Sequence, residues 1–515
     1  MHRTLVIASL SISVVGTLVP GASAFQDAQR PGSAAYQKAR DAFRNGDLAT
    51  AVTEMEKAVA ADPKDADFNG WLGFLLIRTG DPDRAVKHLE TALALRPKVA
   101  ETCTNLGNAL LLRKGRTTAD TRRAIGLLEQ ATKLQPASAD AHNSLGFACW
   151  RLGDFVRAES AYRMVVKLRP ADGQARINHG LALQRLGRDA ESASALRAGT
   201  VALPGNIAAW VALGKVELRA RNVGAAVSAF ESARRKDPGN YEVLLHLGHA
   251  YARSGRDDEA QAAFGAAADR AAAPDADATL RKDAGARYNQ GVILARMDRL
   301  PEALEAYDKA LAIDPRYHEA LLNAGFVLYR LERYGDAAAR FRTATEVKPR
   351  VALGWRNLAM ALDKSADATG ALAAWRKAAG ADPNDYETRE HLAVALVSDK
   401  KEQEAVAIYR DMARLKPASG APLNAIGLIE LKRNRAEAAL EAFLDAVKRD
   451  PKHAPAHNNL GVLYERKGQI NEAIAAYKAA LAADPNFADA KANLARFGNT
   501  TAKPAAPGDP RKPKP

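Results

Sequence analysis

The sequence contains few of the residue patterns on which enzymes and metal proteins depend. Cys103 and Cys149 are the only cysteines among 515 residues, too few for a thiolate zinc site. His318 and Glu319 adjoin, but the second histidine of a zinc-protease helix is missing. There is no G-x-S-x-G turn and no glycine loop after a strand to cradle phosphate. We therefore expect no enzyme activity, no metal, no cofactor and no small-molecule substrate.

Long apolar runs are absent except at the start of the chain. His2 and Arg3 precede an apolar run over residues 5–19, which is shorter than the ~20 residues that span a membrane. An A-x-A site at residues 22–24 follows, so the segment predicts a signal peptide over 1–24, cleaved before Phe25. An uncleaved anchor is the alternative. The expected mature chain is exported, periplasmic or secreted, and without a transmembrane segment.

The charge is positive but dispersed. Formal net charge is +14, from 74 basic and 60 acidic residues. Removal of the predicted signal peptide takes away only the charge of Arg3. A proline- and lysine-rich tail over 498–515, predicted to be disordered, carries part of the rest. This balance weakly favours acidic partners and indicates no nucleic-acid site.

What the chain has in abundance is a repeated unit, seen most cleanly over residues 454–485. Its first apolar face has helical spacing, Gly468 interrupts it, a second apolar helical face follows, and Asp484-Pro485 ends the unit. The unit resembles the tetratricopeptide repeat (TPR), a helix-turn-helix of about 34 residues. The two faces consist of His457, Leu460, Gly461 and Tyr464, then Ala473, Ile474, Tyr477, Ala480 and Leu481.

The same unit recurs thirteen times when its closing proline is numbered position 32. Position 8 is always glycine or alanine, and position 20 is alanine in every copy except the fifth, which has Ser192. We expect these small residues to let the two helices of a unit approach closely. The seventh copy closes at Ala272, and the other twelve close at Pro63, Pro97, Pro136, Pro170, Pro204, Pro238, Pro315, Pro349, Pro383, Pro417, Pro451 and Pro485.

The resemblance implies an all-α, right-handed α-solenoid superhelix. We divide the chain into a signal peptide (1–24), a short flexible start (25–31), repeats 1–7 (32–272), an insertion (273–283), repeats 8–13 (284–487), a capping helix (488–497) and the tail (498–515). Cys103 and Cys149 fall at positions 4 and 11 of successive copies, two helical turns apart. Buried thiols are therefore expected in place of a disulfide.

The third repeat carries an extra five residues between its helices, with basic residues around them. A protruding basic loop could hold a partner, or it could be a solvated turn. The cations are Arg113, Lys114, Arg116, Arg122 and Arg123.

Positions 2, 5, 6, 9, 12 and 13 of each first helix point away from its second helix. In the TPR family this set lines the concave groove that binds peptides. Asparagine recurs at position 6, and this ladder is similar to that of the TPR region of O-GlcNAc transferases, although no catalytic domain follows. Either these amides hold a peptide backbone, or asparagine is simply common there. The candidate residues are Asn105, Asn178, Asn289, Asn323, Asn357 and Asn459, with Asn493 in the capping helix.

Three pairs of aromatic residues are predicted on the same face, each pair three residues apart and hence adjacent on its helix. They are candidate partner contacts. The alternative is that they pack against neighbouring first helices. The pairs are Trp71 with Phe74, Phe147 with Trp150, and Phe326 with Tyr329.

Position 13 is basic in ten repeats. A basic stripe along the groove is one interpretation, and cations placed favourably at helix C-termini are the other. The residues are Arg78, Arg151, Arg185, Arg219, Arg253, Arg296, Arg330, Lys364, Lys432 and Arg466.

These patterns predict a non-enzymatic scaffold that binds peptide or protein segments in its groove, in the cell envelope or outside it. A substrate-recruiting or regulatory partner of a glycosyltransferase acting in trans is a second hypothesis. A polyanion binder, favoured by the net charge and the basic stripe, is a third.

Overall fold

A computed structural model describes residues 30–497, and these residues form two compact bodies that divide between Arg281 and Lys282. Within that range the chain is helical, with twenty-seven α-helices, one short 3-10 helix and no strand. Thirteen helix pairs account for all but the last helix, so the predicted all-α architecture of helix-turn-helix repeats is confirmed. The predicted signal peptide and tail lie outside the described residues, as does most of the predicted flexible start.

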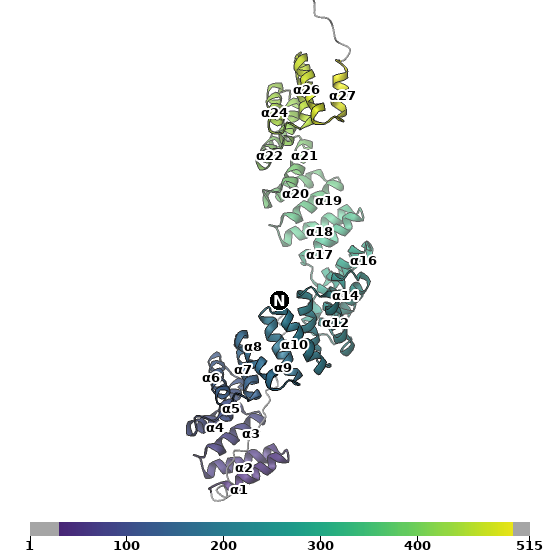
Figure 1. The fold of residues 1–515 in the computed structure, drawn as a ribbon. Helices are drawn as coiled ribbons and strands as arrows, with labels where there is room; N and C mark the ends of the chain where they lie inside the picture. The colour runs from purple at the N-terminus through teal and green to yellow at the C-terminus, as the bar shows by residue number, and fades with distance from the viewer. Residues whose placement is uncertain (1–29, 498–515) are drawn as a thin grey trace, which may run out of the picture. The chain divides into compact units, whose positions relative to one another are not determined.

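The N-terminal body holds repeats 1–7, and each helix in it packs on the next along the chain (Figure 1). We call the two members of a pair its first and second helix. The first helices are α1 (Ser33–Arg44), α3 (Ala66–Arg78), α5 (Ala100–Leu112), α7 (Ala139–Leu152), α9 (Gly173–Arg185), α11 (Ile207–Arg219) and α13 (Tyr241–Arg253). The second helices are α2 (Leu48–Ala61), α4 (Pro82–Leu95), α6 (Thr118–Leu134), α8 (Phe155–Leu168), α10 (Asp189–Ala202), α12 (Val223–Lys236) and α14 (Asp257–Ala272).

The C-terminal body holds repeats 8–13 and a last single helix, after a 3-10 turn, η2 (Leu280–Lys282). Its first helices are α15 (Gly285–Arg296), α17 (His318–Arg330), α19 (Ala352–Lys364), α21 (Tyr386–Ser398), α23 (Ala421–Lys432) and α25 (Ala454–Arg466), and the single helix is α27 (Ala488–Ala495). Its second helices are α16 (Leu300–Ile313), α18 (Tyr334–Val347), α20 (Ala368–Ala381), α22 (Glu402–Leu415), α24 (Ala436–Arg449) and α26 (Ile470–Ala483). None of the helices between residues 30 and 497 combines the length and apolarity needed to cross a membrane.

The small residue at position 8 makes room for a large side chain on the second helix. A Cβ built on Gly214 would lie 2.5 Å from Cζ of Phe230, and one on Gly325 would lie 2.6 Å from Cε1 of Phe341. Both rings are fully buried. In these two repeats glycine at position 8 therefore makes room for the ring at position 24, in addition to the close helix crossing expected from the sequence.

The turn between the two helices of a repeat places position 15 in the left-handed region of backbone space. Glycine occupies it in six repeats, including Gly187 (φ +75°) and Gly468 (φ +76°). Six other repeats put a residue with a side chain there, at φ between 58° and 63°, and five of these six lie in the C-terminal body. A left-handed conformation costs about 1–2 kcal/mol for residues other than glycine. The six residues are Arg221, Asp298, Glu332, Ala366, Lys400 and Asn434.

A side-chain donor at position 4 joins consecutive repeats. Nε1 of Trp210 donates to the carbonyl oxygen of Pro204 at 3.1 Å, and Nε1 of Trp355 donates to that of Pro349 at 2.8 Å. Asn69, Arg176 and Arg389 bind the preceding closing proline in the same way. The proline that ends one repeat therefore also presents an acceptor to the next.

Both cysteines are buried free thiols, as predicted. Burial raises the pKa of Cys149 to about 11 and also raises the pKa of Cys103. Neither thiol is therefore ionised to a useful extent near neutral pH, and both act as small apolar groups in the core.

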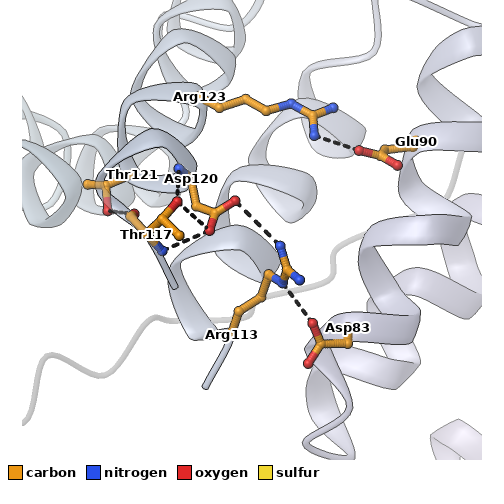
Figure 2. A network of polar contacts seen from close by, with 7 residues as sticks. All are labelled: Asp83, Glu90, Arg113, Thr117, Asp120, Thr121 and Arg123. Atoms are coloured by element: carbon orange, nitrogen blue, oxygen red, sulfur yellow. Dashed lines mark hydrogen bonds and ion pairs between the residues drawn. The ribbon is translucent and has the colours of Figure 1, made fainter. Parts of the chain in front are cut away.

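The basic loop of repeat 3 is held against repeat 2 by ion pairs (Figure 2). Nε of Arg113 lies 2.7 Å from Oδ1 of Asp83, and Nη1 of Arg123 lies 2.6 Å from Oε1 of Glu90. Nη1 of Arg113 also reaches Asp120, whose carboxylate caps the start of α6 together with Thr117. Two of the five cations therefore serve the junction between repeats.

Candidate functional site

The candidate site is the face of each first helix that points away from its second helix, at positions 2, 5, 6, 9, 12 and 13. We call this the first-helix face. The two bodies differ sharply there at position 9. In the C-terminal body position 9 is apolar in all six repeats, and four of these side chains are well exposed: Phe326 at 55%, Val394 at 53%, Leu428 at 47% and Met360 at 38%. Val292 and Val462, at the two ends of the series, are half-buried.

Trp71 and Phe74 lie in the core and are not exposed on this face. They retain 7% and 2% of their exposure, and the Trp71 ring makes edge contacts with Tyr36, Phe43 and Phe74 at centroid distances of 5.5–6.1 Å. The packing alternative therefore describes this pair. The sequence did not reveal the burial, because the partners Tyr36 and Phe43 come from the repeat before.

Much of the surface of Phe147 and Trp150 is also buried against neighbouring side chains. Phe147 is 9% exposed, with the Arg151 guanidinium over its ring at 5.6 Å. Trp150 is half-buried and makes an edge contact with Phe155 at 5.1 Å. The Arg185 guanidinium lies over the rings of Trp150 and Phe155.

Phe326 and Tyr329 are the accessible pair. Phe326 is the most exposed of the apolar side chains on the C-terminal first-helix face. Tyr329 is half-buried against Tyr334, with ring centroids 5.2 Å apart. Of the three predicted pairs, this one keeps the most surface for a partner.

Several of the position 6 asparagines bind the preceding repeat. Nδ2 of Asn459 donates to Oδ1 of Asn424 at 2.9 Å, and Nδ2 of Asn323 donates to the hydroxyl of Tyr288 at 3.3 Å. Asn493 makes the same bond to Asn458, and each acceptor stands at position 5. These amides therefore help to set the spacing of consecutive first helices.

Other asparagines have more hydrogen-bonding capacity left. Asn178 is buried and accepts from Nε2 of Gln174 at 2.9 Å. Asn105, Asn289 and Asn357 are half-buried, and none makes a side-chain hydrogen bond within residues 30–497. Their role in holding a partner stays a prediction.

Three of the position 13 cations form ion pairs with the preceding repeat. Arg219 pairs with Asp189 at 2.6 Å, Arg330 with Asp298 at 2.7 Å and Lys432 with Glu402 at 3.1 Å. Exposed pairs of this kind contribute little stability, about 0–1 kcal/mol each. They do neutralise part of the predicted basic stripe.

The N-terminal body carries a charged group on its first-helix face. Nζ of Lys215, at position 9, lies 2.5 Å from Oε1 of Glu242, and Nε2 of His246 lies 3.7 Å from the same oxygen. Interactions with His246 and Lys215 lower the pKa of Glu242 to about 2. The His246 ring also stacks on Phe230 at a centroid distance of 5.5 Å.

Histidines and carboxylates do not gather into a metal site in the part of the chain that the structure describes. His318 is buried, with its Nδ1 3.2 Å from the carbonyl oxygen of Ala344. His318 therefore links α17 to α18.

Comparison with models of protein families shows which family the chain belongs to. Tetratricopeptide repeat models match residues 36–100, 116–173, 150–207, 217–282, 322–385, 359–420 and 424–496. A TPR repeat model matches residues 291–332. The chain belongs to the tetratricopeptide repeat family. Only repeats of this family are matched, and TPR proteins are typically scaffolds that bind proteins or peptides.

Several solved structures match the chain at low similarity. YrrB, described as a TPR protein with an unusual peptide-binding site, is 25% identical over 36% of this chain and 93% of its own, with a TM-score of 0.31. MamA from Desulfovibrio magneticus RS-1 is 20% identical over 35% of this chain and 96% of its own, with a TM-score of 0.30. Naa15/Naa10 bound to HypK-THB is 14% identical over 91% and 96%, with a TM-score of 0.32. No curated protein matches the chain.

In this TPR protein the position 9 series of the C-terminal body was missed by our sequence interpretation. The signal was present, because the same position is apolar in six consecutive repeats at a constant interval. Each predicted aromatic pair lies within a single repeat, whereas the exposed apolar series takes one residue from each repeat.

Proposed function

We propose that this TPR protein is a non-enzymatic scaffold that binds peptide or protein segments along its first-helix faces. The observation that carries the proposal is the exposed apolar series at position 9 of repeats 8–13. Exposure of large apolar side chains to water on a helix face is unfavourable, and their burial by a partner is favourable. Family membership supports the same function.

Export is part of the proposal. The charged start, the short apolar run and the A-x-A site favour a cleaved leader. We therefore place the scaffold in the cell envelope or outside the cell. Mass spectrometry of the protein recovered from its native cells should find Phe25 at the mature N-terminus. A chain that retains residues 1–24 would contradict this placement.

A photo-crosslinking amino acid tests the binding face in the full chain. It replaces Asn357 on first helix α19 or, as the matched control, exposed Lys377 on second helix α20. After irradiation in an extract of the native cells, the Asn357 variant should form discrete protein adducts and the Lys377 variant should not. Equal labelling of the two helices, or none at Asn357, would overturn the proposal.

The other hypotheses find less support. For polyanion binding, part of the basic stripe is occupied by ion pairs between repeats, as at Arg219 and Arg330. Heparin binding whose affinity falls steeply with rising salt would support the polyanion hypothesis. The glycosyltransferase-linked role depends on the asparagine spacing alone, and several of those amides bind neighbouring side chains.

A further inference from the structure

Met360 is the most exposed methionine between residues 30 and 497. It stands at position 9 of α19, within the exposed apolar series, and 38% of its surface is exposed. Met55 and Met412 are buried, and Met164 and Met297 are half-buried. Both cysteine thiols are buried as well. An oxidant in solution therefore reaches the Met360 sulfur more readily than any other sulfur in the described chain.

Two hydrogen-bond donors flank Met360. Asn357 lies three residues before it and Lys364 four residues after it, so both are its neighbours on the helix surface. Neither side chain makes a hydrogen bond or an ion pair within residues 30–497. Asp363, the acidic residue of the same turn, accepts a hydrogen bond from Nε1 of Trp375 at 2.8 Å. The helix surface beside the Met360 thioether therefore carries two donors with unused capacity.

Phe326 in the preceding repeat shows that this arrangement is not general. The donors at the same two positions beside Phe326 are already bound within the chain. Nδ2 of Asn323 donates to the hydroxyl of Tyr288 at 3.3 Å, and Nη2 of Arg330 lies 2.7 Å from Oδ1 of Asp298. The two unused donors are therefore a property of the repeat that carries the exposed methionine.

Oxidation would change what these donors can bind. A thioether sulfur is only a weak hydrogen-bond acceptor, whereas the oxygen of methionine sulfoxide is strongly polar. The amide of Asn357 and the ammonium group of Lys364 can both donate to such an oxygen. A partner that packs an apolar group on Met360 would then meet a polar group in its place, which is unfavourable unless the partner also offers a donor.

We infer that Met360 is a site of reversible oxidation that weakens partner binding on the first-helix face. The oxidant belongs to the hydrogen peroxide class. The oxygen–oxygen bond breaks, a sulfur–oxygen bond forms, the sulfur gives up two electrons, and the peroxide leaves as water with both of its protons. Methionine sulfoxide reductases reverse the step. This inference rests on the proposed function and adds its regulation.

Peptide mass spectrometry of the full chain during a hydrogen peroxide titration tests the site. Met360 should gain one oxygen atom at least about tenfold faster than Met412, with Met164 and Met297 between them, because the rate follows exposure of the sulfur. Treatment with methionine sulfoxide reductases should return Met360 to the thioether. Oxidation of Met412 as fast as that of Met360 in the folded chain would overturn the inference.

Photo-crosslinking tests the effect on binding. The crosslinking amino acid replaces Leu353, which is 43% exposed at position 2 of α19, two helical turns before Met360, and this choice leaves Asn357 in place. In an extract of the native cells the untreated chain should form discrete protein adducts. Prior oxidation, with the peroxide then removed, should lower their yield at least about fivefold, and the reductases should restore it. An unchanged yield with Met360 fully oxidised, or no adduct before oxidation, would overturn the inference.

Variants of Met360 assign the effect to this residue. Met360→Leu has no sulfur at this position, so its adduct yield should be the same with and without peroxide. A fall in Met360→Leu as large as that in the unmodified chain would place the effect elsewhere and overturn the inference. Met360→Gln introduces a polar group without oxidation and should lower the yield in the absence of peroxide. Thermal unfolding of both variants checks that they are folded.

The inference and the broader function can fail separately. If the crosslinker at Asn357 captures a partner, while full oxidation of Met360 leaves the adducts at Leu353 unchanged, the scaffold function stands and the oxidative switch is wrong. If neither position captures a partner in the untreated chain, the proposed function fails and the switch fails with it.

Discussion

The two bodies are built from the same repeat and use position 9 in opposite ways. In the N-terminal body Phe74 and Phe147 at position 9 are buried, and Leu181 is half-buried. In the C-terminal body Phe326 occupies the same position and is more than half exposed. Phe74 is covered by Trp71 and Phe43, whereas no ring contact covers Phe326 among the described residues. Phenylalanine at position 9 therefore contributes to the core of one body and forms exposed apolar surface on the other.

The largest expected effect contrasts Trp71 with Phe326. Trp71→Ala should lower the free energy of unfolding of the N-terminal body by about 3–5 kcal/mol, because it removes the centre of an aromatic cluster. Phe326→Ala should change that of the C-terminal body by no more than about 0.5 kcal/mol. Urea unfolding followed by hydrogen exchange of peptides from each body measures both. Trp71→Phe is the milder control, since the indole N–H has no hydrogen-bond partner in the described chain. Similar losses for Trp71→Ala and Phe326→Ala would refute the contrast.

The second prediction tests whether each body has its own core. Gly214→Leu forces a side chain against Phe230 and should cost about 1–3 kcal/mol in the N-terminal body. Gly325→Leu should do the same against Phe341 in the C-terminal body. Gly224→Leu is the control, because a Cβ there meets open space. Hydrogen exchange should report loss of protection only in the body that carries the change, and loss in both would argue against separate cores.

A third, smaller effect is specific to the polar face of the N-terminal body. The pKa of Glu242 is held at about 2, below its ordinary 4.5. A lowered carboxyl pKa stabilises the fold above the unfolded pKa, and this contribution is lost as pH falls from 4.5 towards 2. Glu242→Gln should therefore cost on the order of 1 kcal/mol at pH 7, after allowance for solvent screening. The difference from the unmodified chain should vanish near pH 2 in thermal unfolding. A difference that does not change with pH would exclude this origin.

The smallest effect concerns the left-handed turns, where the bodies again differ. Ala366→Gly should stabilise the C-terminal body by about 0.5–1 kcal/mol, because relief of the left-handed conformation outweighs the extra freedom of glycine in the unfolded chain. Gly187→Ala should destabilise the N-terminal body by a similar amount. Thermal melting of the two variants measures the opposite shifts. Shifts of the same sign would show that backbone strain at position 15 is not the cause.

Much of the architecture could be predicted because its signals are local or strictly periodic. The closing prolines, the small residue at position 8 and the turn at Gly468 each report on a helix boundary or a crossing within one repeat. Burial on the first-helix face could not be predicted in the same way, since Trp71 is covered by Tyr36 and Phe43 of another repeat. The function of the position 4 side chains was missed for a similar reason, as Trp210 binds a carbonyl that belongs to the preceding repeat.

The candidate site shows the same limit. Helical periodicity gives Asn459 and Asn357 the same position in their repeats. It could not separate Asn459, which binds Asn424, from Asn357, which has no side-chain partner in residues 30–497. The position of neighbouring helices decides whether a residue on that face is free.

Hydroxyl-radical footprinting of the unliganded full chain tests the central contrast most directly, because oxidation of methionine and aromatic side chains follows their exposure. Met360 and Phe326 should be oxidised readily, while Met412, Phe74 and Phe147 should be protected. Protection of Met360 and Phe326 in the free chain, or oxidation of Phe74 at a comparable rate, would contradict the account.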